Sequence, residues 1–508
     1  MDSPSSIERS ALSAGRRANI ARLLRPRSIV FVGGQQLARP IDSCRSIGFS
    51  GDMWAVNPAR KELAGLICYP SLAELPAVPD AAFIAVNAGA SIAVVEELNR
   101  LGAGGAVCYA AGYAERGEAG LRLQEQLVHA AGDVAILGPN CYGLLNYLDG
   151  VALWADAHGG EALEEGAAII SQSGNISLNF TMTERSVPLA KVIAVGNQAQ
   201  LGPGDFIEPL LEDPRIKAIG LYLEGLDDVS TFSRAALAAL EKGVPLVALK
   251  VGRSAHASRI AASHTASLAG EDGLYSALFD RLGVMRVPSL TAFMETLKFL
   301  SLHGGFAGGR LGVLTCSGGD AALFADLADR EGLTIPPLSQ KQVESISAQV
   351  THITTVANPL DYNTAIWGAK EKLETCFTAV MSEGTDATAL VIDYARGHLP
   401  GIEEWDAAIE GLIGAAARAK GLGLAVATFP ELLPERVRRR LIAKGLIPLQ
   451  GLEEAMIALG RAHWYEKRRT SLLARGDVSD LRLARLPSPQ GAPRNCDEAE
   501  SKSRLKSY

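Results

Sequence analysis

Ser28-Ile29-Val30-Phe31-Val32-Gly33-Gly34 is the stretch that decides the fold class of this chain. Its apolar run predicts a strand buried on both faces, and the two glycines predict the turn that ends it. Similar apolar runs follow, with amphipathic helical patterns between them. The predicted strands are 53–56, 81–86, 105–109 and 134–137, and the helices include 92–101 and 118–130. Strands that alternate with helices through short connections predict a doubly wound parallel sheet.

The same alternation recurs twice further along the chain. The predicted strands are 167–170, 192–195, 218–223 and 246–249, and then 311–314, 389–392 and 423–428; helices include 321–331 and 432–444. We therefore predict an α/β protein of three doubly wound units, at residues 19–150, 151–305 and 306–466. Residues 1–18 are predicted to form a flexible leader, and the polar, proline-containing segment 467–508 a disordered tail.

Size and composition are those of a soluble globular protein. A length of 508 residues allows roughly two to four domains. Hydrophobic residues make up 48% and charged residues 21%. The formal net charge of −7 argues against nucleic acid as a partner.

The cysteines predict a reducing cytoplasm. All seven are scattered, without a CxxC pair or a Cys/His cluster, so we expect no zinc or other metal site. No secretion signal is visible at the N-terminus, and no apolar run reaches the length of a membrane span.

Candidate ligand contacts in the first unit stand where its predicted strands end. In a doubly wound sheet the ligand crevice lies at the carboxyl ends of the strands. The candidates are Gly33, Gly34, Gln35, Asn57, Pro58, Asn87, Ala111, Gly112 and Asn140. The glycines do not form a GxGxxG motif, and Asn57-Pro58 stands where a nicotinamide dinucleotide site needs an acidic residue. A tight turn and a loop that binds a phosphate through backbone N–H groups remain open.

The second unit carries the candidate catalytic residues. Ser171, Ser173, Gly174 and Asn175 lie between a predicted strand and helix, where helix N–H groups and hydroxyls suit either a phosphate or ordinary N-capping. Glu224 ends a strand and is either an exposed charge or an anchor for an imidazole. His264 lies among small residues after the strand that ends at Leu249, and is either structural or nucleophilic. Cys316-Ser317-Gly318-Gly319 in the third unit is interpreted as a structural turn, since no general base is evident near the thiol.

Taken together, several strings resemble the NDP-forming acyl-CoA synthetases, the superfamily of succinyl-CoA synthetase and ADP-forming acetyl-CoA synthetase. The resemblance runs from about Asn19 to Ala462. The strings include Arg25-Pro26-Arg27-Ser28, Val56-Asn57-Pro58, Ala110-Ala111-Gly112-Tyr113, Gly138-Pro139-Asn140-Cys141, Ser171-Gln172-Ser173-Gly174, Gly196-Asn197-Gln198-Ala199, Leu223-Glu224-Gly225, Lys250-Val251-Gly252-Arg253-Ser254 and Ser263-His264-Thr265.

The resemblance implies a Rossmann-like CoA-binding domain followed by two flavodoxin-like domains. It implies that His264 is phosphorylated during the cycle, that Glu224 steadies it, and that Ser171 to Asn175 hold the phosphate. The first-unit strand ends would then bind CoA.

Two departures from the family pattern stand out. Gln36 to Ile41, with Pro40, replaces a glycine-rich stretch after the first strand, and Ala266 replaces a glycine after His-Thr. The ATP-grasp module, which binds ATP or GTP and Mg²⁺ in this family, is not found.

The resemblance therefore implies an α-type component that forms a hetero-oligomer with a separate ATP-grasp chain. The alternatives are a regulatory protein that binds CoA or acyl-CoA without turnover and, less favoured, a nucleotide-dependent oxidoreductase.

Overall fold

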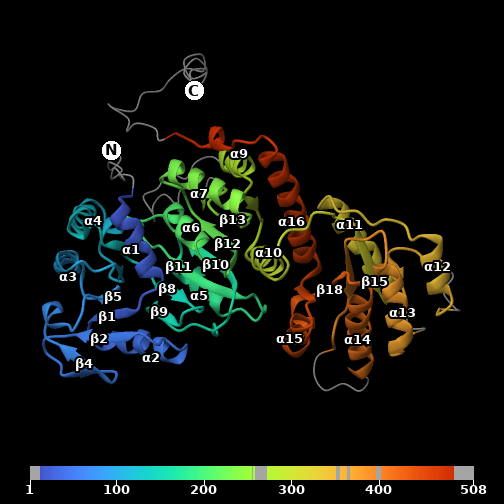
Figure 1. The fold of residues 1–508 in the computed structure, drawn as a ribbon, viewed down its shortest axis with the longest axis horizontal. Helices are drawn as coiled ribbons and strands as arrows, with labels where there is room; N and C mark the ends of the chain where they lie inside the picture. The colour runs from blue at the N-terminus through green and yellow to red at the C-terminus, as the bar shows by residue number, and fades with distance from the viewer. Residues whose placement is uncertain are drawn as a thin grey trace, which may run out of the picture.

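The computed structural model describes residues 12–254, 256–257, 272–350, 355–362, 366–395 and 402–484. Three sheets follow one another along the long axis of the molecule, in chain order (Figure 1). His264 and Ala266 lie outside the described residues.

The first sheet has the strand order of a Rossmann fold. Its strands are β1 (Ser28–Gly33), β2 (Asp52–Val56), β3 (Glu62–Leu63), β4 (Leu66–Tyr69), β5 (Ala81–Ala85), β6 (Gly105–Cys108) and β7 (Ala135–Leu137). They lie in the order β3-β4-β2-β1-β5-β6-β7, and every pairing is parallel except that of β3 with β4. Without β3, the order along the chain is 3-2-1-4-5-6, which reverses direction between β1 and β5.

Helices cover both faces of this sheet. They are α1 (Ala14–Leu24), α2 (Ala38–Ser46), α3 (Ala88–Leu101) and α4 (Glu118–Ala131). Ile29 and Phe31 of β1 pack in one buried cluster with residues of α1 and α2, whereas Val30 and Val32 pack in another with residues of α3 and α4. Because side chains alternate between the faces of a strand, the unit is doubly wound as predicted.

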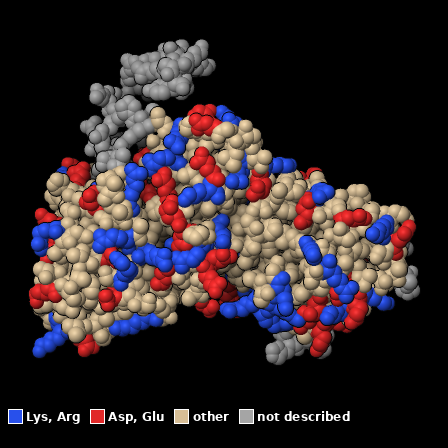
Figure 2. Space-filling model, in the orientation of Figure 1, with Lys and Arg blue, Asp and Glu red and all other residues tan. Residues whose placement is uncertain are grey.

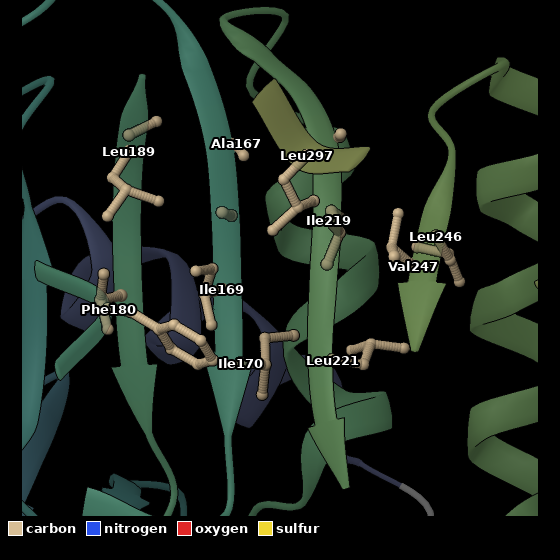
Figure 3. Packing of buried hydrophobic residues seen from close by; sticks show 14 of the residues in the cluster. Ala167, Ile169, Ile170, Phe180, Leu189, Ile219, Leu221, Leu246, Val247 and Leu297 are labelled. Atoms are coloured by element: carbon tan, nitrogen blue, oxygen red, sulfur yellow. The ribbon is translucent and has the colours of Figure 1, made fainter. Parts of the chain in front are cut away.

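The second sheet has the order β14-β13-β12-β10-β11-β8-β9. Its strands are β8 (Gly143–Asn146), β9 (Val151–Trp154), β10 (Gly166–Ser171), β11 (Leu189–Ala194), β12 (Ile216–Leu223), β13 (Leu246–Lys250) and β14 (Met285–Arg286). Its helices are α5 (Gly174–Thr181), α6 (Pro203–Leu211), α7 (Val229–Lys242), α9 (Asp272–Leu282) and α10 (Leu290–Leu302). The parallel strands β10 to β14 have the flavodoxin order 2-1-3-4-5. The order in which the chain adds strands to the sheet reverses between β10 and β12. Apolar side chains of β10 and β12 pack with Phe180 and with Leu297 of α10 in its core (Figure 3).

The third sheet has the flavodoxin order as well. Its strands β15 (Leu311–Thr315), β16 (Leu360–Asp361), β17 (Ala387–Val391), β18 (Leu422–Ala427) and β19 (Ile447–Gln450) lie in the order β16-β15-β17-β18-β19. Its helices are α11 (Gly318–Arg330), α12 (Gln340–Ser347), α13 (Lys370–Met381), α14 (Ile402–Ala419) and α15 (Glu435–Ala443).

The observed boundaries differ from the predicted ones at three places. Ser13 caps α1, which begins at Ala14 inside the predicted leader. The hairpin β8–β9 pairs with β11, so the second sheet begins at Gly143 and not at residue 151. The long helix α16 (Leu452–Leu473) packs against α10 and is followed by buried Leu481, so residues 467–484 are not the disordered tail that we predicted.

Two features of the described residues bear on membrane association: the length and apolarity of the helices, and the charges on the surface. No helix in the described part of the chain is long and apolar enough to cross a bilayer. On the face shown in Figure 2, acidic and basic side chains are interspersed over all three units.

Candidate functional site

The reversal points of the first two sheets coincide with the candidate residues. In doubly wound sheets ligands bind outside the carboxyl ends of the strands, where the strand order reverses. In the first sheet these ends are Gly33 and Ala85, and in the second they are Ser171 and Leu223. The phosphate-site candidates and Glu224 thus lie on adjacent strand ends of one sheet.

A hollow of about 560 Å³ opens at the reversal point of the first sheet. Five of the nine predicted ligand residues line it: Gly33, Gly34, Asn57, Pro58 and Asn87. Its volume lies within the range of small-molecule sites. Asn87 caps α3 by accepting a hydrogen bond from Ala90 N at 2.9 Å, which places the N-terminus of that helix at the hollow.

The Asn57 side chain and Gly33 shape the lining of this hollow. Asn57 Nδ2 donates to Gly33 O at 2.7 Å, and Asn57 Oδ1 accepts from Ala59 N at 2.9 Å, so this side chain joins the ends of β1 and β2. Gly33 has φ +148°, and a Cβ there would lie 2.6 Å from Ala85 O. A glycine is therefore required where β1 reaches the edge.

A 3-10 turn replaces the glycine-rich stretch of the family pattern. Gln35–Leu37 form this turn, and α2 begins directly after it, with Pro40 in its first turn. A proline costs little there, because the N–H that it lacks has no partner within the helix. Gln36 Nε2 donates to Ala85 O at 2.5 Å, and Gln35 Oε1 accepts from Arg60 at 3.4 Å, so Gln35 lies beside the hollow without lining it.

The other three predicted CoA residues lie at a different part of the edge, next to the second unit. Ala111 and Gly112 are in the loop after β6, and Asn140 N donates to Ala110 O at 3.0 Å. Asn140 Nδ2 donates to Asn197 Oδ1 of the second unit at 3.2 Å. The structure therefore divides the nine residues between the hollow, its rim and the contact with the second unit.

The serines at the end of β10 build the first turn of α5. Buried Ser171 accepts a hydrogen bond from Ser173 N at 3.2 Å and donates to Ser173 O at 2.9 Å. Ser173 is the N-cap, and its Oγ accepts from Ile176 N at 3.4 Å. Gly174 and Asn175 begin the helix, where N–H groups have no acceptor within the helix and can bind an anion.

Tyr142 packs against the start of α5. A Cβ at Gly174 would lie 2.3 Å from the Tyr142 ring, so a glycine is needed for this approach. The ring in turn packs on Trp154, with centroids 5.4 Å apart.

Gln172 is the residue of this edge that we did not single out from the sequence. Its Oε1 accepts hydrogen bonds from both Glu224 N and Gly225 N, and its Nε2 donates to Gly225 O at 2.7 Å and to Gln198 Oε1 at 3.0 Å. The side chain is 6% exposed. Gln172 therefore bridges the reversal point and holds the backbone of Glu224. Only its place within the Ser-Gln-Ser-Gly string pointed to it.

Both ends of the segment that carries His264 reach this same edge. Lys250, 2% exposed at the end of β13, lies over the Tyr275 ring at 4.5 Å, and burial lowers its pKa. Arg253 and Asp272 lie on either side of the undescribed residues 258–271, with Arg253 Nε 3.9 Å from Asp272 Oδ2. Arg286 also pairs with Asp272. The Arg253–Asp272 contact thus joins the two described ends that flank residues 258–271.

The edge of the third sheet does not offer a reactive thiol. Partial burial and the charges of Asp320, Asp361 and Asp393 raise the pKa of the Cys316 thiol, which keeps it protonated near neutral pH. Among the residues that the structure describes, no group of His, Cys, Asp and Glu side chains is arranged to hold a metal ion.

Two family models match the first two units. A "CoA binding domain" model matches residues 38–147, and a "Succinyl-CoA ligase like flavodoxin domain" model matches residues 164–300. Fold and models together define the class, α/β proteins that join a CoA-binding unit to a succinyl-CoA ligase-like unit.

Curated relatives narrow this class. The chain is 33% identical over 323 residues to subunit alpha of acetate–CoA ligase [ADP-forming] II from Pyrococcus furiosus, an alignment that covers 61% of this chain and 68% of that one. It is 32% identical over 354 residues to trans-feruloyl-CoA synthase FCS1 from an unknown prokaryotic organism, covering 67% of this chain and 50% of that protein. The chain belongs to the NDP-forming acyl-CoA synthetase family and is similar to its α subunits. It spans about half the length of the first curated relatives that it matches.

A solved structure supports the fold. The apo form of the dinucleotide forming acetyl-coenzyme A synthetase 1 of Ca. Korarchaeum cryptofilum is 24% identical, covers 90% of this chain and 99% of its own, and superposes with a TM-score of 0.78. The predicted fold class and the family resemblance are thus confirmed.

Proposed function

We propose that this chain is the α-type component of an NDP-forming acyl-CoA synthetase, which converts a carboxylate, CoA and NTP to acyl-CoA, NDP and phosphate. The observation that carries the proposal is one sheet edge that joins the α5 N-terminus, Glu224 and both ends of the His264 segment. Relatives named subunit alpha support a separate partner, for which an ATP-grasp chain that binds the nucleotide and Mg²⁺ is our proposal.

The proposed residue roles follow from this edge. Ser173, Gly174 and Asn175 offer the first-turn N–H groups and the positive helix end to a phosphoryl group. Gln172 fixes the backbone of Glu224, whose carboxylate steadies one imidazole nitrogen of His264 so that the other attacks phosphorus. Phosphoryl transfer depends on such positioning and charge stabilisation.

The hollow of the first sheet suits the nucleotide portion of CoA. Gly33 and the N-terminus of α3 present backbone to a phosphate at short range, and Asn57 keeps the two strand ends together. CoA, when bound, supplies the thiol that takes the acyl group. Six cysteines in the described part of the chain are unpaired, which fits our proposal of a cytoplasmic protein.

The proposal can be tested without the partner chain by running the acyl-CoA half of the reaction backwards, from acyl-CoA and phosphate to phosphorylated His264. Orthophosphate attacks the thioester carbonyl, the C–S bond breaks, and CoA leaves as the thiol after taking a proton from phosphate. A His264 nitrogen then attacks phosphorus of the acyl phosphate, and the carboxylate leaves. Radioactive phosphate and an acyl-CoA should therefore label the protein with an acid-labile, alkali-stable phosphate.

The acyl-CoA substrates to be tested are those that the names of the relatives suggest: acetyl-, feruloyl- and 4-hydroxybutyryl-CoA. His264→Asn should abolish the label. His256→Asn is the control, because His256 is an exposed histidine, and it should retain the label. CoA binding without any label across the panel would overturn the proposal and favour the regulatory alternative.

A further inference from the structure

The Glu115 carboxylate joins the first unit to the second. Its Oε1 accepts hydrogen bonds from Gly112 N at 2.5 Å and Tyr113 N at 3.1 Å, within the loop that follows β6. Its Oε2 accepts from Asn197 Nδ2 at 2.5 Å, across the boundary between the units. One side chain therefore shapes the loop and attaches it to the ligase unit.

Asn197 is itself held on several sides. Its backbone N donates to Pro139 O at 2.9 Å, and its Oδ1 accepts from Asn140 Nδ2 at 3.2 Å. Its Nδ2 also donates to Gln124 Oε1 of α4 at 3.3 Å. Glu115 thus meets a rigid donor rather than a mobile surface side chain.

Further hydrogen bonds lead from the neighbour of Asn197 to the edge of the second sheet that carries Glu224. Gln198, the next residue, accepts from Gln172 Nε2 at 3.0 Å, and Gln172 holds the amides of Glu224 and Gly225. Hydrogen bonds on either side of the Asn197–Gln198 peptide therefore link the Gly112 loop of the CoA-binding unit to the backbone of Glu224.

The charge of Glu115 strengthens this contact. Burial alone would raise its pKa, but the hydrogen bonds from Gly112, Asn197 and Tyr113 hold the pKa below its ordinary value. The carboxylate is therefore ionised at neutral pH, and hydrogen bonds to a charged acceptor are about twice as strong as neutral ones.

We propose that Glu115 is a positioning residue that fixes the loop 110–117 to the ligase unit, so that the thiol end of CoA meets the acyl phosphate. This role rests on the proposed function. Acyl transfer needs reacting atoms about 3–3.5 Å apart, and an error of about 1 Å can cost about a hundredfold in rate. The loop contains glycines at φ +111° (Gly112) and +79° (Gly117), and Glu115 lies in the short 3-10 turn between them (Ala114–Arg116).

Three variants separate positioning from general structure. Glu115→Ala removes all three hydrogen bonds. Glu115→Gln keeps an oxygen for Gly112 and Tyr113 but removes the charge, and it places an amide NH2 opposite the Asn197 NH2, which is also a donor. Glu118→Ala is the matched control, because Glu118 pairs with exposed Arg122 of its own helix at 2.8 Å.

The labelling reaction is measured against acyl-CoA concentration, and CoA affinity by titration calorimetry. We expect Glu115→Ala to lower the maximal labelling rate at least about tenfold while the Kd for CoA changes less than about threefold, since the hollow is untouched. Glu115→Gln should recover part of the rate, because it keeps the bonds from Gly112 and Tyr113, and Glu118→Ala should match the parent. An unchanged maximal rate in Glu115→Ala, or a loss that appears wholly in CoA affinity, overturns the proposal.

Hydrogen exchange of peptides that cover the loop 110–117 tests the role of Glu115 separately from the proposed function. If the parent is not labelled by any acyl-CoA, the proposed function fails. Faster exchange of the loop in Glu115→Ala, and not in Glu118→Ala, then still supports the attachment of the loop to Asn197. Unchanged exchange overturns it.

Discussion

Replacing Gln172 by alanine should damage both the stability of the second unit and the chemistry at its edge. The substitution removes the acceptor for Glu224 N and Gly225 N and the donor for Gly225 O and Gln198 Oε1. A buried polar group that loses its partner costs about 1–3 kcal/mol. Water that enters the vacated space restores some of these bonds, so we expect a loss of about 3 kcal/mol in the free energy of unfolding.

The functional effect should exceed the loss of folded protein. Without Gln172 the backbone of Glu224 is no longer fixed relative to α5, and we expect phosphate labelling of the chain to slow by about tenfold to a hundredfold. Urea unfolding, with hydrogen exchange of peptides from β10 and β12 to assign the transition, measures the stability. The labelling reaction with radioactive phosphate and acyl-CoA measures the rate.

Gln200 provides the matched control. It is also a glutamine with 6% exposure, and its Oε1 accepts from Ile136 N at 2.8 Å, away from Glu224. Gln200→Ala should cost about 1 kcal/mol and leave the labelling rate of the folded protein unchanged. Equal labelling rates in Gln172→Ala and the parent, or equal slowing in both variants, would refute the reasoning.

Two further predictions concern charge and backbone. Burial alone would raise the pKa of Asp213, but hydrogen bonds from Arg215 and Lys191 hold it well below its ordinary value of 3.8, so its contribution to stability is present above that value and lost as the pH falls below it. Asp213→Asn should cost about 3 kcal/mol at neutral pH, a difference that shrinks from about pH 5 to about pH 2 in urea unfolding; a constant difference would contradict the assignment. Gly33→Ala places a Cβ 2.6 Å from Ala85 O at φ +148°, so we expect a loss of about 1–3 kcal/mol and CoA binding at least about tenfold weaker by calorimetry. Unaltered binding would exclude the β1 end from the CoA site.

Local sequence patterns were enough to predict most strands of the three sheets. Runs such as 29–32 and 218–223 are apolar throughout because both faces of a parallel strand are buried, and the structure places strands at both. The glycines and serines that end β1 and β10 were also visible, since turns and helix caps depend on neighbouring residues.

The tertiary structure decided which of these strand ends meet. The hairpin β8–β9 joins the second sheet through pairing with β11, and α16 is ordered because it packs against α10; neither contact is local in the sequence. Gln172 reaches Glu224 across 52 positions and Glu115 reaches Asn197 across 82. A polar side chain carries no periodic signal of a distant partner, so the sequence by itself determined three doubly wound units and their edge residues. Only folding brought the edges of the first two units together, where hydrogen bonds on either side of the Asn197–Gln198 peptide link them.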